Sequence, residues 1–174
     1  NNPYRIPVTT VRAGNVIGGG DWGEERLVPD IVNALHNNTP LSIRNPNATR
    51  PWQHVLDCLN GYVMLSDSLL AGVEHAALNI GPSKEAFVSV AEVSDRVARN
   101  LGFKSDWKLS ENSEPHEAGL LALDASLAEQ TLGWKGKLGF EQSIRWTTNW
   151  YQQINQGSSA RETTLNQIDA FVNL

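Results

Sequence analysis

A strand-like run that ends in a glycine-rich loop is the feature that most constrains this chain. Residues 6–11 are rich in β-branched side chains and lead to Gly14, a pattern typical of a strand followed by a turn. Val16 and Ile17 extend the apolar run, and three consecutive glycines follow at residues 18–20. Open α/β sheets place their ligands at such strand ends, so residues 11–22 predict part of a binding site.

The rest of the chain alternates between short strand patterns and helical periodicity. We expect strands at residues 6–11, 41–44, 76–80, 107–109 and 121–124. Residues 45–52 contain two prolines and are expected to form a loop. Helices are expected at residues 28–35, 55–70, 89–101, 125–132, 140–154 and 161–172, the third of them opened by Ser89 and Glu92 as a capping box. This alternation predicts an α/β or mixed α+β fold.

Composition and charge exclude several classes of protein. The formal net charge is −5 and there is no block of Lys and Arg, which argues against a nucleic-acid partner. No apolar run is long enough to span a membrane, and no signal peptide is visible, so the cytoplasm is the default location. Cys58 is the single cysteine, which excludes an intrachain disulfide and a cysteine-rich metal site. We expect Cys58 to be a small buried residue on a helix.

Residues 18–23 match the G-x-G-x-x-G pattern of dinucleotide-binding loops, but the match is weak. Asp21 would place a negative charge where a pyrophosphate should lie, and the bulky Trp22 would crowd the turn. The acidic residue expected about 20 positions later is also missing. A loop that contacts substrate is therefore the favoured interpretation, and a self-contained NAD(P)-binding module is a less favoured alternative.

Arginines lie in or beside loops at the ends of the expected strands. Guanidinium groups match two phosphate oxygens at once, and Asn15 adds an amide donor, so together they predict a site for a diphosphate. The arginines are Arg12, Arg26, Arg44 and Arg50. The alternative is that some of them are solvated or paired with Asp21, Glu24 or Glu25.

Several aromatic and histidine side chains invite a functional interpretation. Trp22 and Trp52 could stack on a base, but packing in the core is the favoured role for each. His54 and His116, the latter followed by Glu117, lack the spacing of a metal or catalytic site, so structural or substrate-contacting roles are favoured.

Five stretches of sequence, in order, carry a resemblance to a known family. They are VRAGNVIGGGDW, ERLVPDIVNAL, IRNPNATRPWQHVLDCLNGY, LNIGPS and PHEAGLLALDASLAEQTLGW. The chain resembles the extended short-chain dehydrogenases/reductases of the NAD-dependent epimerase/dehydratase family, in its carboxyl-terminal portion. The implied fold is the last strand region of a doubly wound NAD-binding sheet plus the smaller, mixed α/β substrate domain. We expect residues 1–174 to be this portion, with the glycine-rich NAD loop and the Tyr-x-x-x-Lys pair lying upstream and no catalytic residue present here.

The resemblance also implies roles for individual residues. Asn15 and Arg50 match residues that hold the diphosphate of a nucleotide sugar in this family. Ala13 matches a position that lies near the nicotinamide of NAD. The segment that closes over the nucleotide is matched by Arg26, Leu27 and Val28. The residues that flank its base or ribose are matched by Ile43, Arg44 and Asn45. A late loop that returns to the nucleotide is matched by His116 and Glu117.

The implied reaction is an internal redox cycle on CDP-glucose. NAD oxidises the sugar, water leaves, and the hydride returns to give the 4-keto-6-deoxy sugar, in a protein that forms homodimers. Two alternatives stay open at this point: an epimerase or dehydratase for another nucleotide sugar, and a small non-catalytic nucleotide-binding module.

Overall fold

The computed structural model describes residues 6–110 and 119–174, which form a mixed α/β fold as expected. Among these residues, no helix is both long and apolar enough to cross a membrane. The elements follow in chain order, with a short 3-10 turn, η1, before β6. They are β1 (Val11–Ala13), β2 (Asn15–Ile17), α1 (Leu27–His36), β3 (Leu41–Ile43), β4 (Thr49–His54), α2 (Val55–Leu70), β5 (Leu78–Ile80), η1 (Lys84–Ala86), β6 (Phe87–Ser89), α3 (Val90–Asn100), β7 (Trp107–Leu109), α4 (Ser126–Leu132), α5 (Phe140–Asn155) and α6 (Ala160–Val172).

The strands of the described residues pair in three small sheets. β1 lies parallel to β5, with Ala13 opposite Ile80, and β3 lies parallel to β7. β4 is central to the remaining sheet, because it pairs in parallel with β2 and antiparallel with β6. The β2–β4 register sets Asn15 opposite Trp52. Two segments that are far apart in sequence therefore lie side by side where the binding site was predicted.

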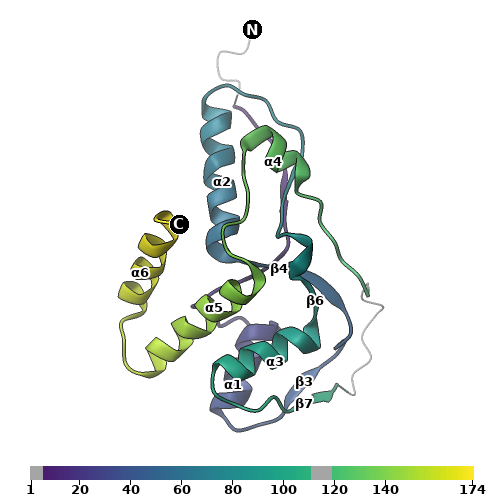
Figure 1. Ribbon diagram of the computed structural model, residues 1–174, viewed down its shortest axis with the longest axis vertical. Helices are drawn as coiled ribbons and strands as arrows, with labels where there is room; N and C mark the ends of the chain where they lie inside the picture. Colours follow the sequence, from purple (N-terminus) through teal and green to yellow (C-terminus); the bar gives the residue numbers. More distant parts are fainter. Residues whose placement is uncertain (1–5, 111–118) are drawn as a thin grey trace.

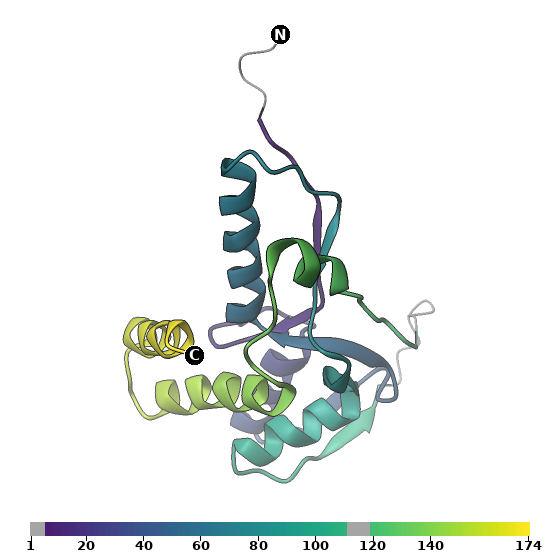
Figure 2. The same cartoon turned by 45° about the horizontal axis from the view of Figure 1, so that its top comes forward.

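The helices lie at the two ends of an elongated arrangement (Figure 1). α2 and α4 accompany β1 and β5, where Trp134 packs in a small apolar cluster with Ile80 and Ala128. α1, α3 and α5 gather at the other end around β2, β3 and β4, and their buried side chains form the main core. Figure 2, a turned view, shows β4 passing between these two groups and leading directly into α2.

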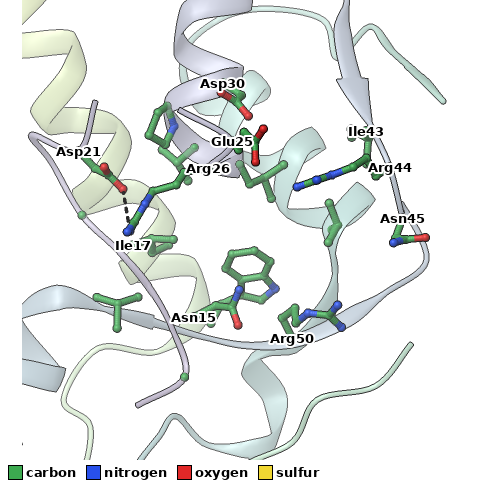
Figure 3. Close-up of a pocket in the computed structure, with 18 of the residues that line it drawn as sticks. Asn15, Ile17, Asp21, Glu25, Arg26, Asp30, Ile43, Arg44, Asn45 and Arg50 are labelled. Carbon is green, nitrogen blue, oxygen red and sulfur yellow. Dashed lines mark ion pairs between the residues drawn. The ribbon is translucent and has the colours of Figure 1, made fainter. Parts of the chain in front are cut away.

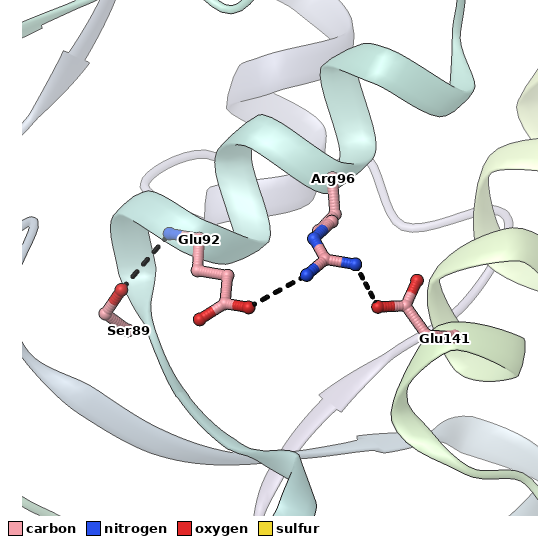
Figure 4. Close-up of polar contacts among 4 residues, drawn as sticks. All are labelled: Ser89, Glu92, Arg96 and Glu141. Carbon is pink, nitrogen blue, oxygen red and sulfur yellow. Dashed lines mark hydrogen bonds and ion pairs between the residues drawn. The ribbon is translucent and has the colours of Figure 1, made fainter.

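A network of polar side chains joins α3 to α5 (Figure 4). Ser89 caps α3 by accepting a hydrogen bond from the backbone N–H of Glu92, 3.2 Å away, as the capping pattern predicted. Arg96 binds the carboxylate of Glu92 one turn earlier and also that of Glu141 on α5. The network fixes the amino-terminal half of α3 against the start of α5.

Asp57 ties the segment after α4 to the first turn of α2. Its side chain is buried, and its two oxygens accept hydrogen bonds from the backbone N–H groups of Lys137, at 2.7 Å, and Leu138, at 3.1 Å. The indole N–H of Trp134 donates to the Asp57 carbonyl oxygen at 3.2 Å. The neighbouring Cys58 is buried on α2, so its predicted structural role is confirmed.

Most of the expected elements are present, but three predictions were wrong. Residues 45–52 were expected to be a loop, whereas Thr49–His54 is β4, which persists despite Pro51 because it pairs on both sides. Residues 121–124 contain no strand, and only Leu120 forms an isolated bridge, to Thr49. The first strand begins at Val11 rather than residue 6, because the partner strand β5 is only three residues long.

Candidate nucleotide-sugar site

One pocket of about 590 Å³ collects the predicted substrate residues (Figure 3). A volume of this size is typical of pockets for small organic ligands. Its lining comes from β2 and the loop after it, the start of α1, the end of β3, and β4. All the predicted substrate-binding residues that the structure describes line this pocket: Asn15, Arg26, Leu27, Val28, Ile43, Arg44, Asn45 and Arg50.

The glycines of the loop are explained by close packing. A Cβ atom on Gly14 would lie 2.3 Å from the carbonyl oxygen of Pro51, so only glycine lets β4 approach this closely. A Cβ atom on Gly19 would lie 2.0 Å from the indole ring of Trp150 on α5. Gly19 is thus covered by an aromatic ring and does not provide the open backbone that a pyrophosphate needs. This packing argues against a dinucleotide-binding role for residues 18–23.

The loop that lines the pocket is held by α5. The hydroxyl of Tyr151 donates a hydrogen bond to the carbonyl oxygen of Asp21 over 2.6 Å. Trp22 contacts the rings of Trp150 and Tyr151 edge-on, yet its side chain is 55% exposed, so the predicted core position is wrong for this residue. The Asp21 carboxylate accepts from the Gly23 N–H at 3.0 Å and lies 3.6 Å from the Arg26 guanidinium.

Three of the four predicted arginines reach the pocket. Arg26 and Arg44 are exposed at its mouth, while Arg50 is only 6% exposed and donates from Nη1 to the carbonyl oxygen of Thr49 at 2.9 Å. Arg12 lies on β1 opposite Asn79 and does not line the pocket. The pairing of an arginine with Asp21, weighed as an alternative, is present at Arg26, where both side chains remain partly exposed.

The sequence did not predict the acidic side of the pocket. Glu25 and Asp30 line it together with the arginines. Burial raises the pKa of Asp30 above its ordinary value of 3.8, the negative charge of Glu25 raises it further, and Arg44 opposes the shift. Glu25 adopts a φ of 59°, a backbone conformation that residues other than glycine rarely take. The ERLVPDIVNAL stretch contains both carboxylates, but only Arg26, Leu27 and Val28 were predicted from it as substrate-binding residues.

Trp52 and His54, two residues apart on β4, are both buried. Trp52 is buried, its ring lines the pocket, and its indole N–H donates to the carbonyl oxygen of Val88 at 3.0 Å. His54 is fully buried and caps α2, because its Nδ1 accepts the Leu56 N–H at 3.3 Å. Burial lowers the pKa of His54 to about 4, so the ring is neutral at pH 7. The favoured interpretations of both residues agree with this arrangement.

The remaining predicted residues lie outside the pocket or outside the described residues. Ala13 ends β1, directly before Gly14, which begins the pocket lining. His116 and Glu117 fall in the segment that the structure does not describe.

Known proteins resemble this chain in sequence and in fold. Residues 1–81 match the NAD dependent epimerase/dehydratase family. The chain is also 38% identical over 156 residues to the CDP-glucose 4,6-dehydratase of Salmonella typhimurium, covering 88% of this chain and 44% of the relative. The family resemblance read from the five motifs is thereby confirmed.

Solved structures of related enzymes have the same fold. A dTDP-glucose 4,6-dehydratase from Bacillus anthracis, in complex with NAD, superposes with a TM-score of 0.73 at 24% identity, over 88% of this chain and 47% of that one. A UDP-glucuronic acid 4-epimerase from Bacillus cereus, in complex with UDP-glucuronic acid and NAD, superposes with a TM-score of 0.74 at 18% identity. The match covers 87% of this chain and 47% of that one. This chain therefore spans about half the length of these proteins. The expected fold of an extended short-chain dehydrogenase/reductase is confirmed.

Proposed function

We propose that this chain supplies the nucleotide-sugar-binding portion of an NAD-dependent dehydratase that converts CDP-glucose to CDP-4-keto-6-deoxyglucose. The observation that carries the proposal is the pocket itself, in which Arg26, Arg44 and Arg50 gather with the amide of Asn15. Planar guanidinium groups bind phosphate oxygens in pairs, and the diphosphate is the charged part of a nucleotide sugar. The relative from Salmonella typhimurium supports CDP-glucose as the substrate.

In this proposal the described residues bind and orient, and NAD supplies the chemistry by accepting and returning a hydride. Residues 18–23 do not fit the NAD pyrophosphate, because the ring of Trp150 covers Gly19. Ala13, at the end of β1 and beside the pocket, is the residue proposed to approach the nicotinamide. The glycine-rich NAD loop and the Tyr-x-x-x-Lys pair belong to the other portion of the enzyme. We therefore expect residues 1–174 alone to be inactive, and the whole enzyme to be a homodimer.

Arg50→Ala tests the diphosphate role. We expect it to weaken the binding of CDP-glucose strongly, by about tenfold or more, and to leave the affinity for NAD unchanged. Arg161→Ala, which removes an exposed arginine of α6, is the matched control and should change neither affinity. Isothermal titration of the full-length enzyme with each ligand measures both effects. An equal loss of affinity for the two ligands would contradict the proposed role of Arg50.

A competition between CDP-, dTDP-, UDP- and GDP-glucose tests the nucleotide. We expect CDP-glucose to displace a bound nucleotide sugar at the lowest concentration. Tighter binding of another of these sugars would reassign the substrate, while the formation of an epimer in place of a 4-keto sugar would reassign the reaction.

A further inference from the structure

The two carboxylates of the pocket lie beside Arg26 and Arg44, on the side away from Asn15 and Arg50 (Figure 3). In Figure 3, Asp30 and Glu25 lie across the pocket from Asn15 and Arg50. A diphosphate bound beside Asn15 and Arg50 would be repelled by carboxylates, so the acidic side must face a different part of the ligand. Beyond the diphosphate a nucleotide sugar carries the ribose and its base at one end and the hexose at the other, and only the base offers an N–H donor.

Asp30 is suited to accept a hydrogen bond from that part. It lies in the first turn of α1 and is half-buried. Within residues 6–110 and 119–174 its carboxylate has no hydrogen-bond donor. Burial raises its pKa, since the carboxylate has lost part of its water shell without gaining donors. A ligand N–H group at this position would restore the missing interaction.

We propose that the carboxylate of Asp30 accepts a hydrogen bond from the exocyclic amine of cytosine and thereby selects CDP-sugars. Uracil and thymine carry a carbonyl oxygen at the same ring position, which a carboxylate repels. A ligand that leaves a buried polar group of the protein without a hydrogen bond is rejected more strongly than one that only changes apolar contacts. This inference rests on the proposed function, because it assumes that the pocket binds a pyrimidine nucleotide sugar.

Asp30→Asn is the decisive variant, because it keeps the shape of the side chain and replaces one acceptor oxygen with a donor. The protein is titrated with CDP, UDP and a CDP analogue that carries hydrogen in place of the exocyclic amine. We expect the wild-type protein to bind CDP about tenfold or more tightly than either other ligand. In Asp30→Asn the preference for CDP over UDP should shrink about tenfold, since the amide can donate to the uracil carbonyl. The exposed Asp169→Asn on α6 is the control and should keep the wild-type preference.

The ligand series separates this inference from the proposed function. If the wild-type protein binds CDP and the analogue equally, or if Asp30→Asn keeps the wild-type preference, Asp30 does not read the base, and the proposed nucleotide-sugar site stands. If CDP, UDP and the analogue all fail to bind, the proposed function fails and the inference with it. The comparison of CDP with its analogue needs no variant, so it decides the question even where Asp30→Asn does not fold.

Discussion

The hydroxyl of Tyr151 on α5 donates a hydrogen bond to the carbonyl oxygen of Asp21 across 2.6 Å, and so fastens the loop that forms one wall of the pocket. Burial raises the pKa of Tyr151 to about 12, which keeps this donor protonated throughout the neutral range. The contact joins residues 130 positions apart in the chain. The carboxyl-terminal helices thus take part in shaping a site that the earlier segments line.

Tyr151→Phe removes this hydrogen bond and keeps the ring. We expect the loss to destabilise the protein by about 1 kcal/mol and to weaken CDP-glucose binding several-fold, because Asp21 and its ion-pair partner Arg26 lose their anchor. Urea unfolding and isothermal titration measure the two effects. Tyr62→Phe on α2, outside the pocket lining, is the control and should alter stability without altering binding. Unchanged binding in Tyr151→Phe would show that the loop needs no such anchor.

Gly19→Ala should be strongly destabilising. The added methyl group would lie 2.0 Å from the Trp150 ring, and Trp150 is buried in the main core. Overpacking of this kind costs about 1–3 kcal/mol or more. Gly119→Ala, whose Cβ would meet no atom of residues 6–110 or 119–174 within 4 Å, is the control and should have little effect. A thermal melt of the two variants gives the comparison, and equal melting temperatures would contradict the packing explanation of the glycine loop.

His54 makes stability depend on pH. Its pKa is lowered by burial from 6.5 to about 4, so the folded state favours the neutral ring more than the unfolded state does. The stabilisation is therefore complete above about pH 6.5 and is lost as the pH falls toward 4. The full shift corresponds to about 3 kcal/mol.

His54→Asn isolates this dependence, because asparagine can also cap a helix but does not titrate. Urea unfolding between pH 7.5 and 4.5 should show a smaller fall in stability for His54→Asn than for the wild-type protein. Parallel curves for the two proteins would assign the acid sensitivity to other groups.

Asp57→Asn should destabilise the protein by about 1–3 kcal/mol. The carboxylate accepts backbone N–H groups on both oxygens, and an amide would turn its own N–H₂ group toward one of those donors. Burial raises the pKa of Asp57, while its hydrogen bonds with Lys137 and Leu138 lower it. The exposed Asp67→Asn on the same helix is the control, and chemical denaturation of both variants measures the difference. Similar stability of the two variants would mean that Asp57 does not hold the loop.

Local sequence patterns predicted the helices well and one central strand badly. α3 and α5 have strong apolar periodicity, so their positions follow from the sequence alone. β4 contains Pro51 and follows a polar stretch, and it becomes a strand only because β2 and β6 pair with it from distant parts of the chain. Local propensity cannot reveal such pairing.

The same distinction holds for the pocket. Arg26, Arg44 and Arg50 were found because cations at strand ends indicate an anion site, and the motif resemblance added Asn15. Asp30 was missed because it occupies a helical position where an acidic residue is ordinary, in the first turn of α1. Only the fold shows that this turn faces the cavity.

The contact between Gly19 and Trp150 has a consequence for variation among homologues. If the ring of Trp150 is what keeps position 19 small, the two positions should covary. Homologues with a short side chain at position 150 would then be able to accept alanine or serine at position 19. The G-x-G-x-x-G spacing survives these replacements, because its three glycines are Gly18, Gly20 and Gly23. Searches that assign cofactor loops from glycine spacing would therefore match both kinds of homologue and would not register the change of packing at position 19.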